Sequence, residues 1–276
     1  MFESFLITSR DTFEAALVIG TVFAYLNKTN SGQYRKTAYY GIFCRVLLSV
    51  LGAFLFSLFV DGFQGRAEQI SEGITMLLGA FLLTTMILWM MQQKYLTREI
   101  EGQVEKHLQK SHIMFSHLGI FLLILVAVLR EGVEMVIFLK AASYAGGTNL
   151  IGGILGVAAA VFVGYMFFAN LSKINLKSIF NVSSILLILF AAGLVLHGTH
   201  EFVEAGIIPG IVTPIFDISH VLSDESIFGS FLKGLFGYVS NPSLVEILAY
   251  AAYLGRISYL YLGIRNSGAA AKNQKF

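Results

Sequence analysis

Charged residues are scarce in this sequence of 276 residues. Lys, Arg, Asp and Glu together make up 13% of it, whereas a soluble domain carries about 25%. Hydrophobic residues make up 56%, and the mean hydropathy is +0.72. This composition excludes an ordinary soluble protein and predicts an all-α integral membrane protein surrounded by lipid. The formal net charge is +2, and no basic stripe is present, which excludes a nucleic-acid partner.

Cysteine and proline are scarce as well. The single cysteine, Cys44, cannot form an internal disulfide, and the sequence has no Cys/His spacing of a zinc site. Cys44 lies in an apolar segment, which favours a packed side chain. The three prolines all follow residue 208, so no helix before that point has a proline kink. The N-terminus carries Glu3 where a signal peptide is basic, so we expect a retained first span.

Long apolar runs, by contrast, are abundant. A helix needs about 20 mostly apolar residues to cross a bilayer. Seven segments meet this requirement, and the sequence therefore predicts seven transmembrane helices. They lie at about 3–26, 38–60, 71–91, 114–143, 149–171, 178–199 and 244–264.

The distribution of Lys and Arg predicts the orientation of these helices, because cytoplasmic loops are enriched in both residues. With the N-terminus outside, the outer loops hold only Arg66 and Lys233. We therefore expect an N-out, C-in topology with a long, acidic outer connection at 200–243. The inner loops then hold Lys28, Arg35, Lys36, Lys94, Arg98, Lys106, Lys110, Lys173, Lys177, Arg265, Lys272 and Lys275.

A short motif occurs twice. Residues 10–14 read RDTFE and residues 130–134 read REGVE, so each has an Arg, an acid, two other residues and a Glu. Three spans separate the copies, which therefore run in opposite directions. This pattern is typical of an inverted 3+3 repeat with a binding site near the membrane midplane. We expect one transmembrane domain over 1–276, with repeat A at about 1–92, repeat B at about 113–200 and a seventh helix after them.

Small residues recur along two of the segments that this repeat would relate to each other. Such stripes let helix backbones approach closely, and packing explains them. The second segment has Gly41, Ser49, Ala53 and Ser57, and the fifth has Gly152, Gly156, Ala160 and Gly164.

Each copy of the motif places its charges on one helix face, because positions i, i+3 and i+4 are neighbours. A charge at mid-helix costs roughly 2.5–3.5 kcal/mol even on the milder insertion scale. Arg–Glu pairs that lock the bundle would explain half of the acids but not Asp11 and Glu131. A net negative cluster of oxygen ligands suits a hard cation. The candidate metal ligands are thus Asp11, Glu14, Glu131 and Glu134, supported by Arg10 and Arg130.

A second set of acids is expected at the outer face. His200 and Glu204 share a helix face, and His197 lies one turn before them, where we expect a structural role. A solvated helix end would explain these residues, as would an acid that complements a helix dipole. The alternative is a vestibule that collects cations, made of Glu72, His200, Glu201 and Glu204.

These motifs resemble those of the high-affinity iron permeases, the oxidase-dependent iron transporters of fungi and bacteria. That family carries an Arg-Glu-Gly-Leu-Glu type motif in its first and fourth spans. LREGVEMVIFL fits the fourth-span copy closely, and SRDTFEAALVIG fits the first with Asp11 in place of Glu and Thr12 in place of Gly. SEGI at 71–74, HEFVEAG at 200–206 and the stretch 216–238 are similar to the bacterial branch.

The resemblance implies a multi-pass permease of the cytoplasmic membrane that imports iron and is not an enzyme. It implies that Arg10, Glu14, Arg130, Glu131 and Glu134 carry the site, with Asp11 at the departing position. It also implies an oxidising partner, either an oxidase or a peroxidase with a periplasmic iron-binding protein. Iron is then the substrate, as Fe³⁺, and no cofactor is permanently bound.

Two alternatives stay open at this stage. A transporter of another divalent metal such as Mn, Zn or Pb would share the site and differ only in its substrate. An intramembrane polyprenyl-diphosphate phosphatase also pairs acidic motifs in inverted repeats. Its phosphate would need cationic and hydroxyl groups, and only Ser9 with Arg10 offers these near a motif.

Overall fold

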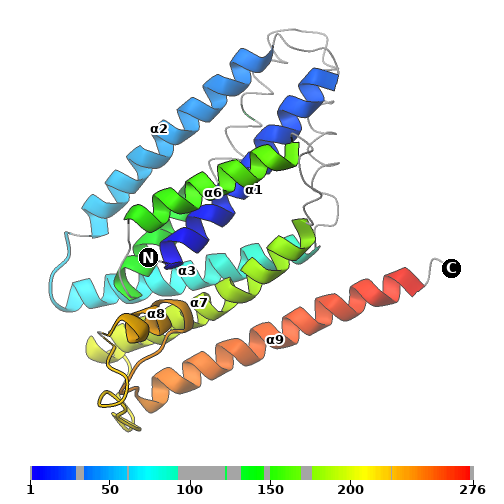
Figure 1. Cartoon of the computed structure of the whole chain (residues 1–276). Coiled ribbons are helices and arrows are strands. Elements are labelled where there is room, and N and C mark those ends of the chain that lie inside the picture. Colours follow the sequence, from blue (N-terminus) through cyan, green and yellow to red (C-terminus); the bar gives the residue numbers. More distant parts are fainter. Residues whose placement is uncertain are drawn as a thin grey trace.

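The computed structural model describes residues 2–28, 34–60, 62–92, 122, 132–145, 150–168, 176–224 and 226–273. These ranges are helical apart from the turns and the connections on either side of α8 (Figure 1). A further helical segment without a label covers 132–145. The labelled helices are α1 (Phe2–Lys28), α2 (Arg35–Val60), α3 (Arg66–Gln92), α6 (Leu150–Phe168), α7 (Leu176–Glu204), α8 (Ile227–Phe236) and α9 (Leu244–Asn273).

Each segment predicted to span the membrane coincides with a helix as far as the structure describes it. The fourth is represented by 132–145, and the rest of that segment lies outside the described residues except for Leu122. By length and composition alone, three described helices could cross a membrane. These are Lys36–Leu58, Arg66–Leu88 and Val182–Glu204.

Helix α6 packs along α1 through its small residues (Figure 1). A Cβ atom at Gly156 would lie 2.6 Å from the carbonyl oxygen of Phe5, which leaves no room for a side chain. Thr8 Oγ1 donates a hydrogen bond to the carbonyl oxygen of Gly153 at 3.0 Å. Farther along, a Cβ at Gly164 would lie 3.2 Å from Ala16. The close packing predicted for the fifth segment is therefore confirmed.

The main core lies between α3, α7 and the segment 132–145. Two glycines bring α3 and α7 together, because Gly73 and Gly198 each face the carbonyl oxygen of the other. Ile7 adds one α1 side chain to this core. The largest fully buried members are Ile7, Met76, Leu83, Met86, Ile87, Phe138, Leu187 and Leu194.

Helix α2 turns its large apolar side chains outward. Just before α2 and in its first turn, the chain packs on α1 through Tyr34 and Ala38, and its exposed face is as apolar as lipid requires. Cys44 is half-buried on this helix. The exposed residues include Phe43, Leu47, Val50, Leu51, Phe54, Leu55 and Leu58.

Helix α8 is short, and it lies between the ends of α1 and α7. Ser226 caps its start by accepting a hydrogen bond from the backbone N–H of Gly229, a common N-cap arrangement. Gly237 ends the helix in the left-handed region with φ of 69°, where glycine carries no steric penalty. The same glycine lies against the backbone of Gly193 on α7, so its missing side chain also permits this approach.

Candidate metal site and outer acidic network

The first copy of the motif lies within the continuous helix α1. Arg10 Nε donates to Glu14 Oε1 at 3.1 Å, which is the i, i+4 ion pair that the spacing predicts. Arg10 is 4% exposed and the Glu14 side chain 12% exposed, so the pair is largely removed from solvent. Asp11 is 2% exposed beside it. The structure thus places all three predicted residues of this copy inside the protein.

The second copy is described only in part. Glu134 lies in the helical segment 132–145 and is 8% exposed. The predicted residues Arg130 and Glu131 lie outside the described residues. A buried carboxylate on this second helix agrees with its predicted place in the interior.

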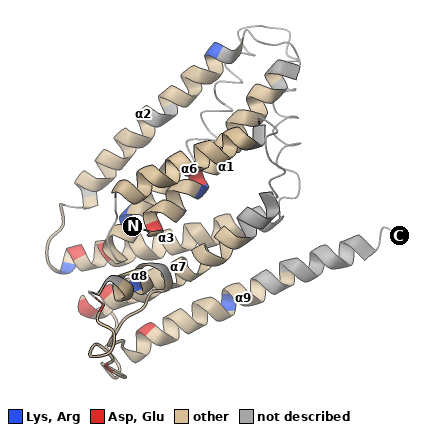
Figure 2. Ribbon diagram, in the orientation of Figure 1, with Lys and Arg blue, Asp and Glu red and all other residues tan. Residues whose placement is uncertain are grey.

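The two helices that carry the motif copies contribute side chains to the same core. Ile7 on α1 and Phe138 on the segment 132–145 belong to one buried cluster. Asp11 follows Ile7 by four residues and Glu134 precedes Phe138 by four, so each acid lies one helical turn from a member of that cluster. Figure 2 shows a group of charges part-way along α1, whereas most other described charges lie near helix ends. Each buried acid therefore lies one helical turn from the main core.

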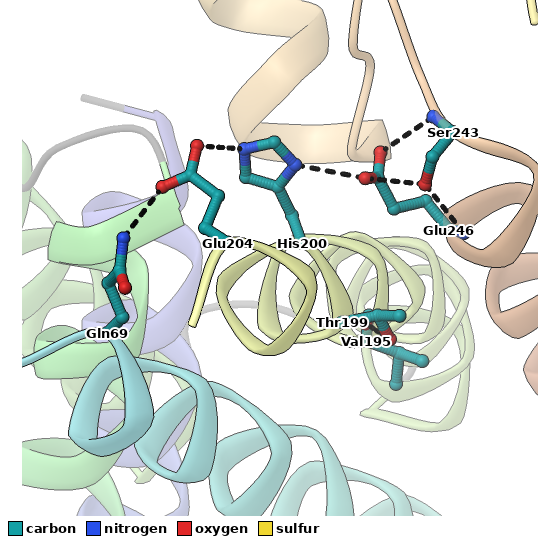
Figure 3. A network of polar contacts seen from close by, with 7 residues as sticks. All are labelled: Gln69, Val195, Thr199, His200, Glu204, Ser243 and Glu246. Carbon is teal, nitrogen blue, oxygen red and sulfur yellow. Dashed lines mark hydrogen bonds and ion pairs between the residues drawn. The ribbon is translucent and has the colours of Figure 1, made fainter. Parts of the chain in front are cut away.

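His200 is the centre of a polar network at the end of α7 (Figure 3). Its Nε2 lies 3.1 Å from Glu204 Oε1, and its Nδ1 lies 2.9 Å from Glu246 Oε1 on α9. Gln69 on α3 donates to Glu204 Oε2 at 3.1 Å. The imidazole thus bridges two carboxylates, and the network ties together the start of α3, the end of α7 and the start of α9.

Glu72 and Glu201, the other predicted vestibule residues, are half-buried near the same network. Their carboxylates interact electrostatically with each other, and Glu201 also interacts electrostatically with Glu204 and His200. Lys140 of the segment 132–145 offsets part of the charge near Glu72. All four predicted vestibule residues therefore gather at one end of the bundle.

Glu246 is a network residue that the sequence analysis missed. It is 2% exposed, and it accepts hydrogen bonds from Ser243 Oγ at 2.7 Å and from the Ser243 backbone N–H at 3.3 Å. The backbone N–H of Glu246 donates to Ser243 Oγ in return, at 3.4 Å. This reciprocal pattern is a capping box, and the signal for it was the SLVE stretch before an apolar run.

His197 is buried one turn before His200, and its ring lies against the backbone of Lys233 on α8. In the outer connection, hydrogen bonds from the side chain and the backbone of Ser219 lower the pKa of the exposed Asp217 carboxyl. Over the described part of the chain, which omits Glu131, no group of three or more His, Cys, Asp or Glu side chains is arranged to hold a metal ion.

Comparison with known proteins identifies the chain's relatives. Residues 1–266 match the model of the iron permease FTR1 family. The chain belongs to this family. It is 32% identical over 259 residues to the ferrous iron permease EfeU of Escherichia coli O6:K15:H31, with 92% of each chain covered. It is 31% identical over 257 residues to the EfeU of Yersinia pestis, covering 92% of this chain and 90% of that protein. No solved structure matches the chain.

Membership of the FTR1 family confirms the resemblance inferred from the paired motifs. The family consists of transporters, so the intramembrane phosphatase alternative is wrong. FTR1 proteins are multi-pass membrane proteins, which agrees with the apolar helices of this chain and with a place in the cytoplasmic membrane. The family match covers both motifs and the outer network alike.

Proposed function

We propose that this chain is a permease that imports iron through a carboxylate site formed by its two motifs. Asp11, Glu14, Glu131 and Glu134 bind the ion as oxygen ligands. Arg10 and Arg130 hold the carboxylates and balance their charge when no ion is bound. The observation that carries this proposal is the burial of Asp11 and Glu134 on two helices that share one core.

The cost of burial supports this assignment. An ionised carboxylate in an apolar interior is unfavourable unless a cation or hydrogen bonds compensate it. Arg10 forms an ion pair with Glu14 and so compensates the charge of that carboxylate. Oxygen-only ligands with excess negative charge favour hard cations, and Fe³⁺ is harder than Fe²⁺. We infer that iron occupies the site as Fe³⁺, after a partner oxidase or peroxidase has oxidised Fe²⁺ outside.

The proposed topology has seven spans, N-out and C-in, as an inverted 3+3 repeat plus α9. Contacts between helix ends support it. The hydrogen bond from Gln69 to Glu204 joins the start of α3 to the end of α7. The contact between His200 and Glu246 joins the start of α9 to the same end. The ring of Phe2 lies 5.5 Å from that of Phe231 on α8, which itself contacts α7. The starts of α1, α3 and α9 thus lie on the side where α7 ends, as the alternation requires.

This shared side is the proposed outer face. There Glu72, Glu201, Glu204 and His200 form the vestibule that collects iron before it reaches the buried acids. A periplasmic iron-binding protein is the expected donor. Access then alternates as one repeat rocks against the other.

The decisive experiment replaces Glu134 by Ala in the full chain reconstituted in proteoliposomes. Uptake of labelled iron should be abolished, while the amount of folded protein in the membrane stays the same. Asp217→Asn is the matched control, because this acid is exposed in the outer connection and should transport normally. Uptake by Glu134→Ala at the wild-type rate would refute the site.

The alternative substrate is another divalent metal. The same vesicles test it by competition, with Mn²⁺, Zn²⁺ or Pb²⁺ added to labelled iron held in a defined oxidation state. We expect iron to enter in preference to all three, and faster when it is supplied with an oxidant. If a competitor is taken up more strongly than iron, that metal is the substrate, and the proposed ligands stay the same.

A further inference from the structure

Helix α8 belongs to the connection between α7 and α9, yet it packs along α7 rather than beyond its end (Figure 1). At the end of α8, Gly237 lies against the backbone of Gly193. Gly193 lies 11 residues after Val182 and 11 before Glu204, the two ends of a candidate membrane span. Eleven residues correspond to about 16 Å at 1.5 Å per residue. The end of α8 therefore reaches the middle of that span.

A second contact gives the direction of α8. The backbone of Lys233 lies against the ring of His197. Lys233 precedes Gly237 by four residues, whereas His197 follows Gly193 by four. Equal steps in opposite directions mean that α8 runs antiparallel to α7. Because α7 runs outward in the proposed topology, α8 runs inward from the outer face.

The chain then returns to the outer face. The non-helical segment 238–243 leads from the end of α8 to the start of α9, which contacts the polar network at the end of α7. Non-helical backbone at membrane depth needs partners from the protein. Asp224 accepts hydrogen bonds from the backbone N–H and the hydroxyl of Ser240, at 3.0 and 3.1 Å. The carbonyl oxygens of Ser240 and Pro242 accept backbone N–H groups from the segment 212–218. The return segment thus has the hydrogen bonds that this depth requires.

The face of α8 that points away from α7 is apolar. Phe228 is 62% exposed and Phe231 is 38% exposed, and no Lys, Arg, Asp or Glu lies at 226–232. The antiparallel register places Phe231 level with Thr199, inside the candidate span. Leu248, in the second turn of α9, is 58% exposed near the same depth. Large apolar side chains exposed at this depth suit the hydrocarbon of a bilayer rather than water.

We propose that α8 and the segment 238–243 form a re-entrant hairpin, which enters the membrane from the outer side as far as the middle of α7. Phe228 and Phe231 then contact the acyl chains of the outer leaflet. The side of entry rests on the proposed topology, whereas the insertion itself does not depend on iron transport. Since α8 contacts both α1 and α7, the outer half of the permease includes a segment that does not cross the whole membrane.

The test places a fluorescent side chain on this face. The single tryptophan, Trp89, is first replaced as Trp89→Phe in the full chain. Phe228→Trp, Phe231→Trp and, as the control, Val221→Trp are then introduced one at a time; Val221 is 88% exposed in the outer connection. In vesicles of phosphatidylcholine with brominated acyl chains, emission should be lost at 228 and 231 but not at 221. Iodide in the water should quench 221 most. Bromine atoms deeper in the chains should favour quenching at 231, which lies farther along α8 toward the midplane.

Equal quenching by iodide at all three positions, without loss of emission in brominated vesicles, would place this face in water, open to a soluble partner, and overturn the inference. Phe228→Cys in a Cys44→Ala background gives a second measurement with a smaller side chain. It should react more slowly than Val221→Cys with a membrane-impermeant thiol reagent, and an equal rate would also overturn the inference. Neither measurement uses iron, so its outcome is separate from that of Glu134→Ala, which tests the proposed function.

Discussion

At the scale of single residues, the most connected side chain of the outer network is Glu246. It closes the capping box with Ser243 and also accepts a hydrogen bond from His200 on α7. One carboxylate therefore accepts the backbone N–H of Ser243 at the start of α9 and docks that helix on α7. The Ser243 hydroxyl accepts the backbone N–H of Glu246, one of the donors that a helix N-terminus otherwise leaves unsatisfied.

Ser243→Ala removes the side chain that caps α9. Loss of an N-cap costs about 0.5–2 kcal/mol, so thermal unfolding of the purified protein should shift to lower temperature. Glu246→Ala should be more destabilising, because it also removes the carboxylate bonded to His200. Ser219→Ala is the control, since the contact of Ser219 with Asp217 that is made through the backbone N–H survives the change. Equal unfolding temperatures for Ser243→Ala and Ser219→Ala would contradict the capping role.

For single residues, the sequence predicted contacts within a helix but not contacts between distant segments. The Arg10–Glu14 pair and the burial of Asp11 and Glu134 followed from helical spacing and from the cost of charges in an apolar segment. The partner of His200 could not be found in this way, because Glu246 lies 46 residues away and only the fold brings the two together.

At the scale of helices, glycine placement decides which surfaces touch. Gly156 on α6 faces the backbone of α1, whereas Gly52 on α2 has nothing within 4 Å of an added Cβ. Substitutions at these two glycines can therefore be compared, because Gly156 lies in a tight helix contact and Gly52 in open space.

Gly156→Ala should destabilise the protein by about 1–3 kcal/mol, the usual cost of an extra carbon in a packed interface. Gly52→Ala should be neutral or stabilising by about 0.5–1 kcal/mol, because alanine favours the helix. Denaturant titration of both variants in the same detergent measures the difference. The packing assignment fails if the two variants have the same stability.

The helices themselves were largely predictable, since apolar length fixes where a span lies. The sequence placed the third segment at 71–91 and the sixth at 178–199, and the observed α3 and α7 extend beyond these limits. The extensions carry polar residues such as Gln69, His200 and Glu204, which hydropathy excludes from a span. Their contacts with each other keep these turns helical.

At the scale of the whole molecule, the described helix ends lie on two opposite sides of the bundle. The starts of α1, α3 and α9 and the end of α7 share one side through the contacts of Gln69, His200 and Phe2. The number of spans and the inverted repeat stay predictions, because the fourth segment is described only over 132–145.

The proposed N-out topology makes a direct prediction for intact cells. In a Cys44→Ala background, Val221→Cys should react with an impermeant thiol reagent, since residue 221 lies in the outer connection and is exposed. Lys36→Cys, also exposed but at the start of α2, should react only after the membrane is opened. The reverse pattern of labelling would invert the topology.

The contact between Gly73 and Gly198 bears on how the two proposed repeats would move. A Cβ on either residue would lie about 3 Å from the carbonyl oxygen of the other, so no ion or water fits between α3 and α7 at that level. In the proposed rocking of one repeat against the other, we expect this line to stay closed. We then expect the opening to form at a distance from it, on the flank of the bundle where α1 carries its acids.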